Sequence, residues 1–274
     1  MNWRDLHIAM AVGTHGNLSD AAHALALDPT TVSRRVTALE GALGTPLFRR
    51  APRQWDPTEA GVAVLAHCAR MADEVRALQH EADRISGRVH GRVRLTAIDA
   101  VCTTWLVPAL GDLRAAHPDL QLELLATNRV VDLTRGTADV AIRLRRPQRA
   151  GLIVRRLARL PLVVAGTPEL AALPRAERPV SLLGVGDLAL PENTVTREHG
   201  GPVAATATSF AVQLSLILGG LGIGALPTRM AEAHGLAVIA DAPARTLWRA
   251  TPETLHRSPR IQAVCEWLDA IFAG

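Results

Sequence analysis

The sequence predicts an α/β protein with a helical N-terminal domain, a long linking helix and a larger C-terminal domain of two α/β lobes. Three observations predict this class. Helical patterns lie within residues 19–44, and a regular series of apolar residues follows at residues 68–85. From residue 91 onwards, strand and helix patterns alternate, as is typical of α/β domains. At 274 residues, the chain is long enough to form two cores.

Composition narrows the cellular setting. The three cysteines are too widely spaced to form a disulfide framework: Cys68, Cys102 and Cys265. No apolar run reaches the roughly 18 residues that cross a membrane, and the opening stretch, MNWRDLHIAM, lacks the pattern of a signal peptide. We therefore expect a cytoplasmic protein without a membrane partner.

Net charge does not by itself predict nucleic-acid binding. All 30 basic residues are arginine, and the net charge is +4. Residues 1–60 contain six arginines and six acidic residues, whereas residues 91–274 contain twenty arginines and sixteen acidic residues. The excess positive charge lies in the C-terminal part, so a prediction of DNA binding depends on how individual arginines are placed.

The residues from Asp28 to Gly44 predict a helix, the reading helix, with one buried and one polar face. Asp28 is a favoured N-cap, Pro29 is tolerated at the first helical position, and Gly44 ends the helix. Apolar residues recur at steps of three or four: Val32, Val36, Leu39 and Leu43. At about 100° per residue, the opposite face carries Thr30, Arg34, Thr37 and Gly41.

This polar face suits the major groove of DNA. Short hydroxyl side chains allow close approach, and Arg34 can donate two hydrogen bonds to O6 and N7 of guanine. Arg35 lies at the flank, where it contacts a phosphate or forms a salt bridge within the protein. A solvated amphipathic helix explains the same pattern, so the flanking segments decide between the two interpretations.

Those flanking segments predict a helix-turn-helix with a wing. A first helix is expected over residues 3–16, and Ser19 is the expected N-cap of a short second helix that packs through Ala21, Ala22 and Leu25. The second helix and the reading helix then form a helix-turn-helix. Beyond them, arginines on a Pro-bounded loop are placed to hold phosphates. The candidate DNA contacts are Thr30, Thr31, Ser33, Arg34, Thr37, Arg49, Arg50 and Arg53.

A long helix is predicted to follow, with Thr58 as its N-cap, and to run to Ser86, with Gly87 ending it. Its apolar residues recur at steps of three or four, as in a short coiled coil: Cys68, Ala72, Val75, Leu78, Ala82 and Ile85. This series packs either on the helix's own domain or on a second copy. We favour a symmetric dimer, because it presents two reading helices to a pseudo-palindromic DNA site.

The C-terminal part reads as alternating strands and helices. The expected order is a strand at 91–100, a helix at 103–118, a strand at 120–127, a short helix at 130–136 and a strand at 138–144. This order predicts a parallel sheet with helices on its faces. A further strand begins at residue 160, and a helix, a strand and a closing helix occupy residues 211–273.

Two such lobes enclose a cleft, and small ligands bind where strand ends and helix N-termini converge. The arginine-rich run from Arg143 to Leu160 is expected to be solvated surface, with a subunit or DNA-backbone contact as the alternative.

No motif predicts catalysis. The stretch GGLGIG, residues 219–224, follows a helix and precedes a strand, the reverse of a phosphate-binding loop. The sequence contains no HExxH, CxxC or GxSxG motif, and Cys102 has no obvious activating partner. We expect a protein that is not an enzyme and binds no metal or cofactor.

Residues 1–61 resemble the winged helix-turn-helix of LysR-type transcriptional regulators. The matching positions are Ala21-Ala22, Leu25, Ser33-Arg34, Leu39-Glu40, Leu43-Gly44, Leu47-Phe48, Arg50, Thr58 and Gly61. The family often has Gln or Ser-Gln at the start of the reading helix, where this chain has Asp28-Pro29-Thr30, so the resemblance does not define the base preference. Most of residues 91–274 resemble the periplasmic-binding-protein-like effector domain of the same family, through GRVRL, HPDLQLEL, GTADVAIR and GLGIGALP.

The resemblance implies three parts. These are a DNA-binding domain at 1–58, a linker and dimerisation helix at 59–87, and an effector-binding domain at 91–274. Within the last, lobe I is expected at about 91–161 and 237–274, and lobe II at about 162–236. Segment 174–205 is short and rich in Pro and Gly against the family, so lobe II is expected to lack an element there. The implied partners are double-stranded promoter DNA, a small-molecule effector, and further copies in a homodimer and homotetramer, with RNA polymerase as a further candidate.

By position, the resemblance places effector contacts at Asp99, Cys102, Thr103, Thr104, Thr127, Arg129, Arg143 and Ser209. Hydroxyl groups and helix N–H groups form an anion seat, and Arg143 can grip a carboxylate with two hydrogen bonds. Asp99 opposes an anion there, so it either caps a helix or favours a cation-bearing effector. For each residue the alternative is an ordinary turn or cap. The alternative function is a cleft enzyme or solute-binding module on a DNA-tethering domain.

Overall fold

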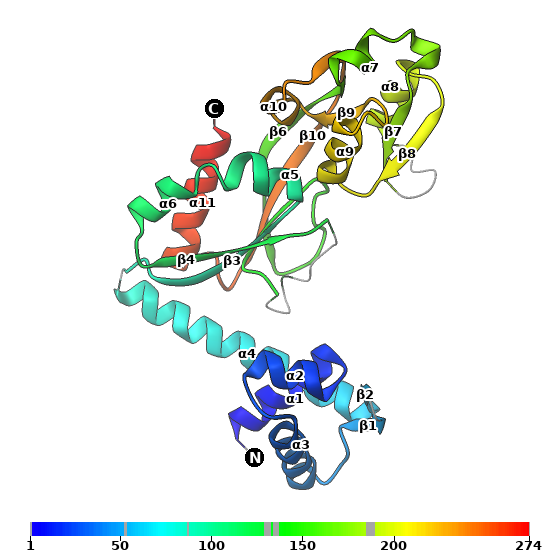
Figure 1. Cartoon of the computed structure of the whole chain (residues 1–274). Coiled ribbons are helices and arrows are strands. Elements are labelled where there is room, and N and C mark those ends of the chain that lie inside the picture. The colour runs from blue at the N-terminus through cyan, green and yellow to red at the C-terminus, as the bar shows by residue number, and fades with distance from the viewer. Residues whose placement is uncertain are drawn as a thin grey trace. The chain divides into compact units, whose positions relative to one another are not determined.

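A computed structural model describes residues 2–51, 54–86, 88–128, 133, 137–184 and 190–273 (Figure 1). The chain forms two compact units, residues 1–79 and 80–274. In the described part of the chain, no helix combines the length and the apolarity that crossing a bilayer requires. The proposed lobe and domain boundaries stay predictions.

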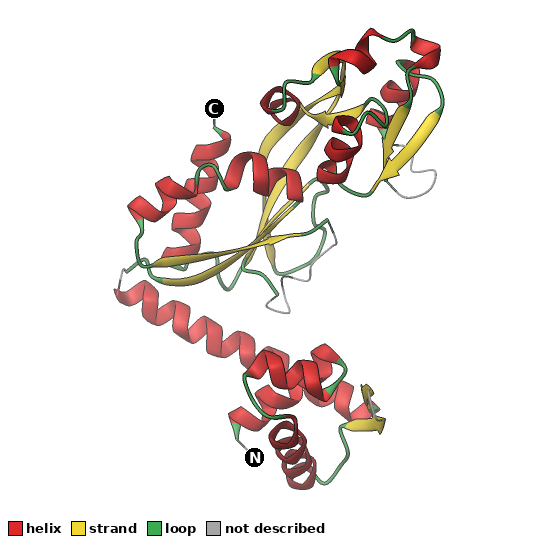
Figure 2. Ribbon diagram, in the orientation of Figure 1, coloured by secondary structure: helices red, strands yellow, loops and turns green. Residues whose placement is uncertain are grey.

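The N-terminal unit contains three short helices, a hairpin and the start of a long helix (Figure 2). Their bounds are α1 (Trp3–His15), α2 (Leu18–Leu25), α3 (Pro29–Leu43), β1 (Phe48–Ala51), β2 (Gln54–Pro57) and α4 (Glu59–Ser86). The helices enclose one core that includes Ile8, Val12, Val36 and Leu39, all at most 2% exposed. The segment expected as an arginine-rich loop is an antiparallel hairpin, in which the backbone of Arg49 lies opposite that of Asp56.

Local capping defines the helix ends of this unit. As expected, Asp28 caps α3 by accepting a hydrogen bond from the Thr30 amide at 2.8 Å, and Gly44 ends α3 with a φ of 69°. The expected N-cap of α2 is wrong. Asn17, not Ser19, caps α2, because its side chain accepts the Asp20 amide hydrogen at 2.8 Å.

The apolar residues in the series along the long helix α4 differ in how deeply they are buried. Cys68 is 1% exposed because it packs into the core of the N-terminal unit, so it does not face a second copy as expected. Ala72 is also buried. In contrast, Val75 and Leu78 are 42% and 71% exposed. The side chains of Ala82 and Ile85 lie outside the described part of the structure.

The C-terminal unit is built on a six-stranded sheet in the order β4-β3-β5-β10-β6-β9. The strands are β3 (Gly91–Ala97), β4 (Leu120–Ala126), β5 (Val140–Arg143), β6 (Leu152–Gly166), β9 (Gly224–Pro227) and β10 (Ala237–Pro252). Strands β3, β4 and β5 are parallel, as predicted. The parallel order does not extend to the rest of the sheet, because β10 runs antiparallel to both β5 and β6, and β6 runs antiparallel to β9.

The two long strands β6 and β10 connect the ends of this unit (Figure 1). They pair from Ala237–Gly166 to Pro252–Leu152. Most of β6 falls in the run expected as solvated surface. Its arginines Arg155, Arg156 and Arg159 are exposed, while Leu160 and the residues after Pro161 are buried. The run is therefore exposed or partly exposed up to Arg159, as expected, and the buried half of β6 begins at Leu160, where the run ends.

Helices cover the sheet at both ends. At one end are α5 (Asp99–Val101), a π-helical turn (Cys102–Leu106), α6 (Leu110–Ala116) and α11 (Pro259–Phe272). The helix expected at 103–118 starts earlier and is interrupted near Pro108, which removes a helical hydrogen bond. The helix expected at 130–136 lies outside the described residues, apart from Leu133.

At the other end, the segment 174–205, which was expected to lack an element, contains several helices and strands. Its elements are a 3-10 turn (Arg175–Glu177), β7 (Val180–Leu183), α8 (Pro191–Glu198) and β8 (Val203–Ala207). Strands β7 and β8 form a separate parallel pair. Helix α9 (Phe210–Leu218) packs on these two strands, whereas α7 (Pro168–Ala172) and α10 (Thr228–Ala233) pack on β6 (Figure 1).

Candidate DNA-binding face and ligand pocket

The polar face of α3 is open to solvent in the N-terminal unit. Thr30, Arg34 and Thr37 are exposed, and Thr31 and Ser33 are partly exposed. Within the described part of the chain, Arg34 has no hydrogen-bond or ion-pair partner. A long guanidinium side chain on a face of short hydroxyl residues is therefore available to a ligand.

The sequence left two roles open for Arg35, a phosphate contact or a salt bridge within the protein, and the structure contains the salt bridge. Its guanidinium lies 3.4 Å from the carboxylate of Asp5, which is 6% exposed on α1. Arg35 thus holds the reading helix against α1 rather than lying free at the flank.

The two wing arginines on β1 differ. Arg49 is exposed and has no partner among the described residues. Arg50 donates to the Thr37 hydroxyl at 2.9 Å, pairs with Glu40, and lies 4.5 Å above the centre of the Trp55 ring. Arg50 therefore braces the wing against α3. Arg53 lies outside the described residues.

Sequence reasoning did not assign a role to Glu40, which organises the junction between α3 and the wing. Its carboxylate is 9% exposed and accepts hydrogen bonds from the amides of Leu47, at 2.7 Å, and Phe48, at 3.1 Å, besides pairing with Arg50. The only signal in the sequence was the fixed spacing of Leu39-Glu40 and Leu47-Phe48.

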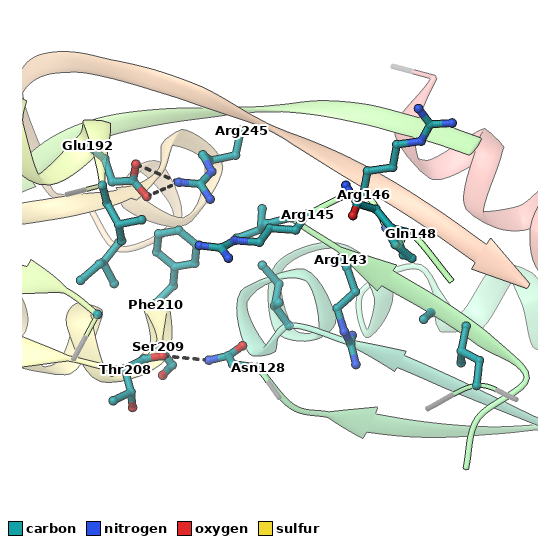
Figure 3. Close-up of a pocket in the computed structure, with 18 of the residues that line it drawn as sticks. Asn128, Arg143, Arg145, Arg146, Gln148, Glu192, Thr208, Ser209, Phe210 and Arg245 are labelled. Atoms are coloured by element: carbon teal, nitrogen blue, oxygen red, sulfur yellow. Dashed lines mark hydrogen bonds and ion pairs between the residues drawn. The ribbon is translucent and has the colours of Figure 1, made fainter. Parts of the chain in front are cut away.

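The C-terminal unit contains a pocket of about 880 Å³ (Figure 3). Its lining comes from the segments that follow β3 and β4, from β5 and the residues after it, from β6, β7 and α8, from the start of α9, and from β10. Five arginines line it: Arg143, Arg145, Arg146, Arg149 and Arg245. Apolar side chains including Ile98, Leu183 and Phe210 form much of the remaining wall. This size and composition suit a small organic ligand.

The pocket includes two of the predicted effector contacts, Arg143 and Ser209. The other described candidates do not line it: Asp99, Cys102, Thr103, Thr104 and Thr127. Arg129 lies outside the described residues.

Two of the candidates that miss the pocket have a local structural role. The Thr103 hydroxyl donates back to the Asp99 carbonyl oxygen at 3.1 Å. Cys102 is 4% exposed, and burial raises the pKa of its thiol. Asn128, next to the predicted Thr127, lines the pocket and donates to the Thr208 carbonyl oxygen at 3.2 Å.

The start of α9 is already capped within the protein. Asp99 accepts the amide hydrogens of Ala100, at 2.7 Å, and Ala211, at 3.3 Å. The Ser209 hydroxyl oxygen accepts the amide hydrogen of Val212 at 3.2 Å. Asp99 therefore has the capping role considered for it, and a role toward a ligand stays a prediction. The expected anion seat at Ser209 is therefore occupied by the protein's own oxygen atoms.

The charged residues of the pocket are held in different ways. Arg143 is partly buried and donates to the Ile142 carbonyl oxygen at 2.8 Å and to the Thr96 hydroxyl at 2.7 Å. Burial lowers the pKa of its guanidinium. Glu192, 2% exposed on α8, makes two contacts with Arg245, at 3.0 and 3.1 Å.

Comparison with known proteins covers both units. Residues 3–62 match bacterial regulatory helix-turn-helix proteins of the lysR family, and residues 86–273 match the LysR substrate binding domain. The Mau operon transcriptional activator of Paracoccus denitrificans is 39% identical over 157 residues, 57% of this chain and 55% of that protein. The match thus spans about half the length of this curated relative.

Solved structures share the fold. The Vibrio cholerae virulence activator AphB, a member of the LTTR protein family, has a TM-score of 0.61 at 19% identity, over 98% of this chain and 99% of that chain. CrgA of Neisseria meningitidis, a LysR-type transcriptional regulator, has a TM-score of 0.60 at 22% identity, over the whole of both chains. Because the two family models together match most of its length, the chain belongs to the LysR family of bacterial regulatory helix-turn-helix proteins.

Proposed function

We propose that this protein is a DNA-binding transcriptional regulator whose arrangement on DNA is controlled by a small molecule in the pocket of its C-terminal unit. The observation that carries the proposal is the open polar face of α3 within a helix-turn-helix of this family, on which Arg34 has no partner among the residues that the structure describes. Double-stranded promoter DNA is the partner that such a face suits. The proposal places the protein in the cytoplasm, with RNA polymerase as a further partner.

The proposed oligomer is a dimer through α4, and two dimers form a homotetramer. The exposed residues Met71, Val75 and Leu78 support the dimer, because steps of four and three place them on one side of α4. By sequence, Ala82 and Ile85 continue the same side. A two-fold dimer brings two copies of α3 to a pseudo-palindromic site.

Ligand control requires that the pocket has unequal affinity for the ligand in two arrangements of the protein. Two contacts join different parts of the pocket wall: Asn128 with Thr208, and Glu192 with Arg245. A ligand that rearranges these two contacts changes how the segments that carry these residues are oriented relative to one another. This change of orientation is the proposed signal. The alternative of a cleft enzyme is not proposed, because the relatives that match are named as transcription regulators.

Replacing Arg34 with alanine should weaken binding to the operator by roughly 1–3 kcal/mol and relax the preference at one base position. The physical reason is the loss of a bidentate contact to a base edge. Fluorescence anisotropy on operator and random DNA at one salt concentration measures both quantities. Arg4→Ala, which removes an exposed arginine on α1, is the matched control and should have little effect. Equal losses on operator and random DNA would show that Arg34 contacts phosphate only.

Replacing Arg49 with alanine should weaken binding to every sequence and reduce the salt dependence. Each lost phosphate contact changes the slope of log K against log salt by about 0.9. Arg50, also predicted as a phosphate contact, should weaken binding broadly when replaced, and its loss should also loosen the wing because it pairs with Glu40. Titrations at four salt concentrations test both variants. An unchanged slope for Arg49→Ala would refute its phosphate contact.

A further inference from the structure

The charged residues that line the pocket of the C-terminal unit are mostly basic. Five arginines line it, and Glu192 is the one acidic residue among the described residues of its wall. That carboxylate is already paired with Arg245 by two contacts. A concave site lined by one sign of charge concentrates ligands of the opposite sign.

The start of α9, a helix of nine residues, does not offer a place for an anion in this pocket. Its first-turn amides already donate to Asp99 and Ser209. The Asp99 carboxylate would also repel a second negative charge there. An acidic ligand group is therefore expected to bind a guanidinium of the segment after β5 rather than the amides of α9.

Arg145 is the residue of that segment best placed to bind an acid. It is exposed and has no hydrogen-bond or ion-pair partner within the described ranges of the chain. Figure 3 shows its guanidinium directed toward the end of the pocket where Phe210 and Arg245 lie. Its neighbour Arg146 is directed elsewhere, with its guanidinium 5.4 Å from the centre of the Trp248 ring.

Apolar side chains line the same pocket, and Phe210 lies at the end toward which this guanidinium is directed (Figure 3). Phe210, Leu183 and Ile98 line the same pocket, and each is at most 7% exposed. Contact with such side chains favours a hydrocarbon or aromatic body by about 25 cal/mol for each Å² removed from water. A guanidinium next to an apolar wall selects a ligand that carries both features.

We propose that the pocket binds an amphipathic organic carboxylate, with its acid group at Arg145 and its apolar body against Phe210. This inference rests on the proposed function only in that it takes the pocket to be the regulatory site. A guanidinium binds a carboxylate through two parallel N–H donors, which an alcohol or an amine cannot match.

Three probes with one body and different head groups test the inference on the full chain. These are 3-phenylpropanoate, 3-phenylpropan-1-ol and 3-phenylpropan-1-amine, titrated by calorimetry at fixed salt. The carboxylate should bind at least about tenfold more tightly than the alcohol, and the amine most weakly. Arg145→Gln should remove this preference. Arg159→Gln, which removes an exposed arginine of β6 outside the pocket lining, should preserve it.

Equal binding of the alcohol, an unchanged preference in Arg145→Gln, or no binding of the carboxylate at millimolar concentration would each overturn the inference. DNA binding by the same preparation separates this failure from failure of the proposed function. Operator binding without a carboxylate preference refutes the ligand class and keeps the regulator. A carboxylate preference lost in Arg145→Gln, without specific DNA binding, supports the ligand class and refutes the regulator.

Discussion

Replacing Leu78 with aspartate should convert the dimer to monomers and remove most of the affinity for the operator. Leu78 is 71% exposed in the single chain, so the substitution costs the isolated chain little. In a dimer through α4 the same position is buried, and an unpaired carboxylate there costs several kcal/mol. Loss of the second reading helix lowers operator affinity by about 10²–10⁴-fold, because binding is no longer bivalent. Sedimentation velocity and anisotropy measure the two effects.

Val62→Asp is the matched control for this variant. Val62 is 60% exposed and lies about 160° around α4 from Leu78, so the aspartate enters the same helix on another side. This control should remain dimeric. A Leu78→Asp protein that sediments as a dimer would remove α4 as the pairing surface.

Replacing Glu40 with alanine should unfold the wing and destabilise the N-terminal unit. The substitution removes the acceptor for the amides of Leu47 and Phe48 and leaves Arg50 without its carboxylate. Each buried donor left unpaired costs about 1–3 kcal/mol, so the sum is roughly 2–6 kcal/mol. Urea denaturation followed by circular dichroism should show a lower first transition, and DNA binding should fall with it.

Glu59→Ala provides the comparison, because Glu59 is exposed in the first turn of α4. Its loss should cost at most about 1 kcal/mol, from its interaction with the helix dipole. If Glu40→Ala and Glu59→Ala had the same stability, the hydrogen bonds of Glu40 would not hold the wing in place.

The helix-turn-helix could be predicted closely because its signals are local. The N-cap Asp28, the apolar steps of α3 and the ending Gly44 all act within a few residues. The N-cap of α2 was misplaced because Asn17 and Ser19 are both good caps, and only the hydrogen bond to Asp20 distinguishes them. A cap prediction is therefore accurate to about two residues where several polar residues adjoin.

The long strands were harder to predict because their pairing is not local. In β6, adjacent arginines such as Arg155 and Arg156 conceal the alternation of a strand, and its partner β10 lies some eighty residues later in the chain. Antiparallel pairing between segments so far apart leaves no signal in either segment alone. The predicted parallel order held for β3, β4 and β5, and the helix, strand and closing helix predicted within residues 211–273 correspond to α9, β9 and α11.

The pocket was only partly foreseen for the same reason. Arg143 and Ser209 were predicted, whereas Arg145, Glu192 and Arg245 come from segments that pattern analysis treated as surface or left unassigned. Helix periodicity also could not separate Cys68 from Leu78, because the face that packs within one chain and the face that meets a second chain share the same spacing.

Specific DNA binding is central to the proposed function, and selection from genomic DNA tests it most directly. Purified full-length protein would retain fragments of the source genome at fixed salt, and retained fragments would be sequenced and footprinted. We predict enrichment of a few fragments, each with two dyad-related protected half-sites, as a dimer that presents two α3 helices requires. Retention of fragments in proportion to their abundance, by protein that sediments as a dimer, would contradict the assignment as a sequence-specific regulator.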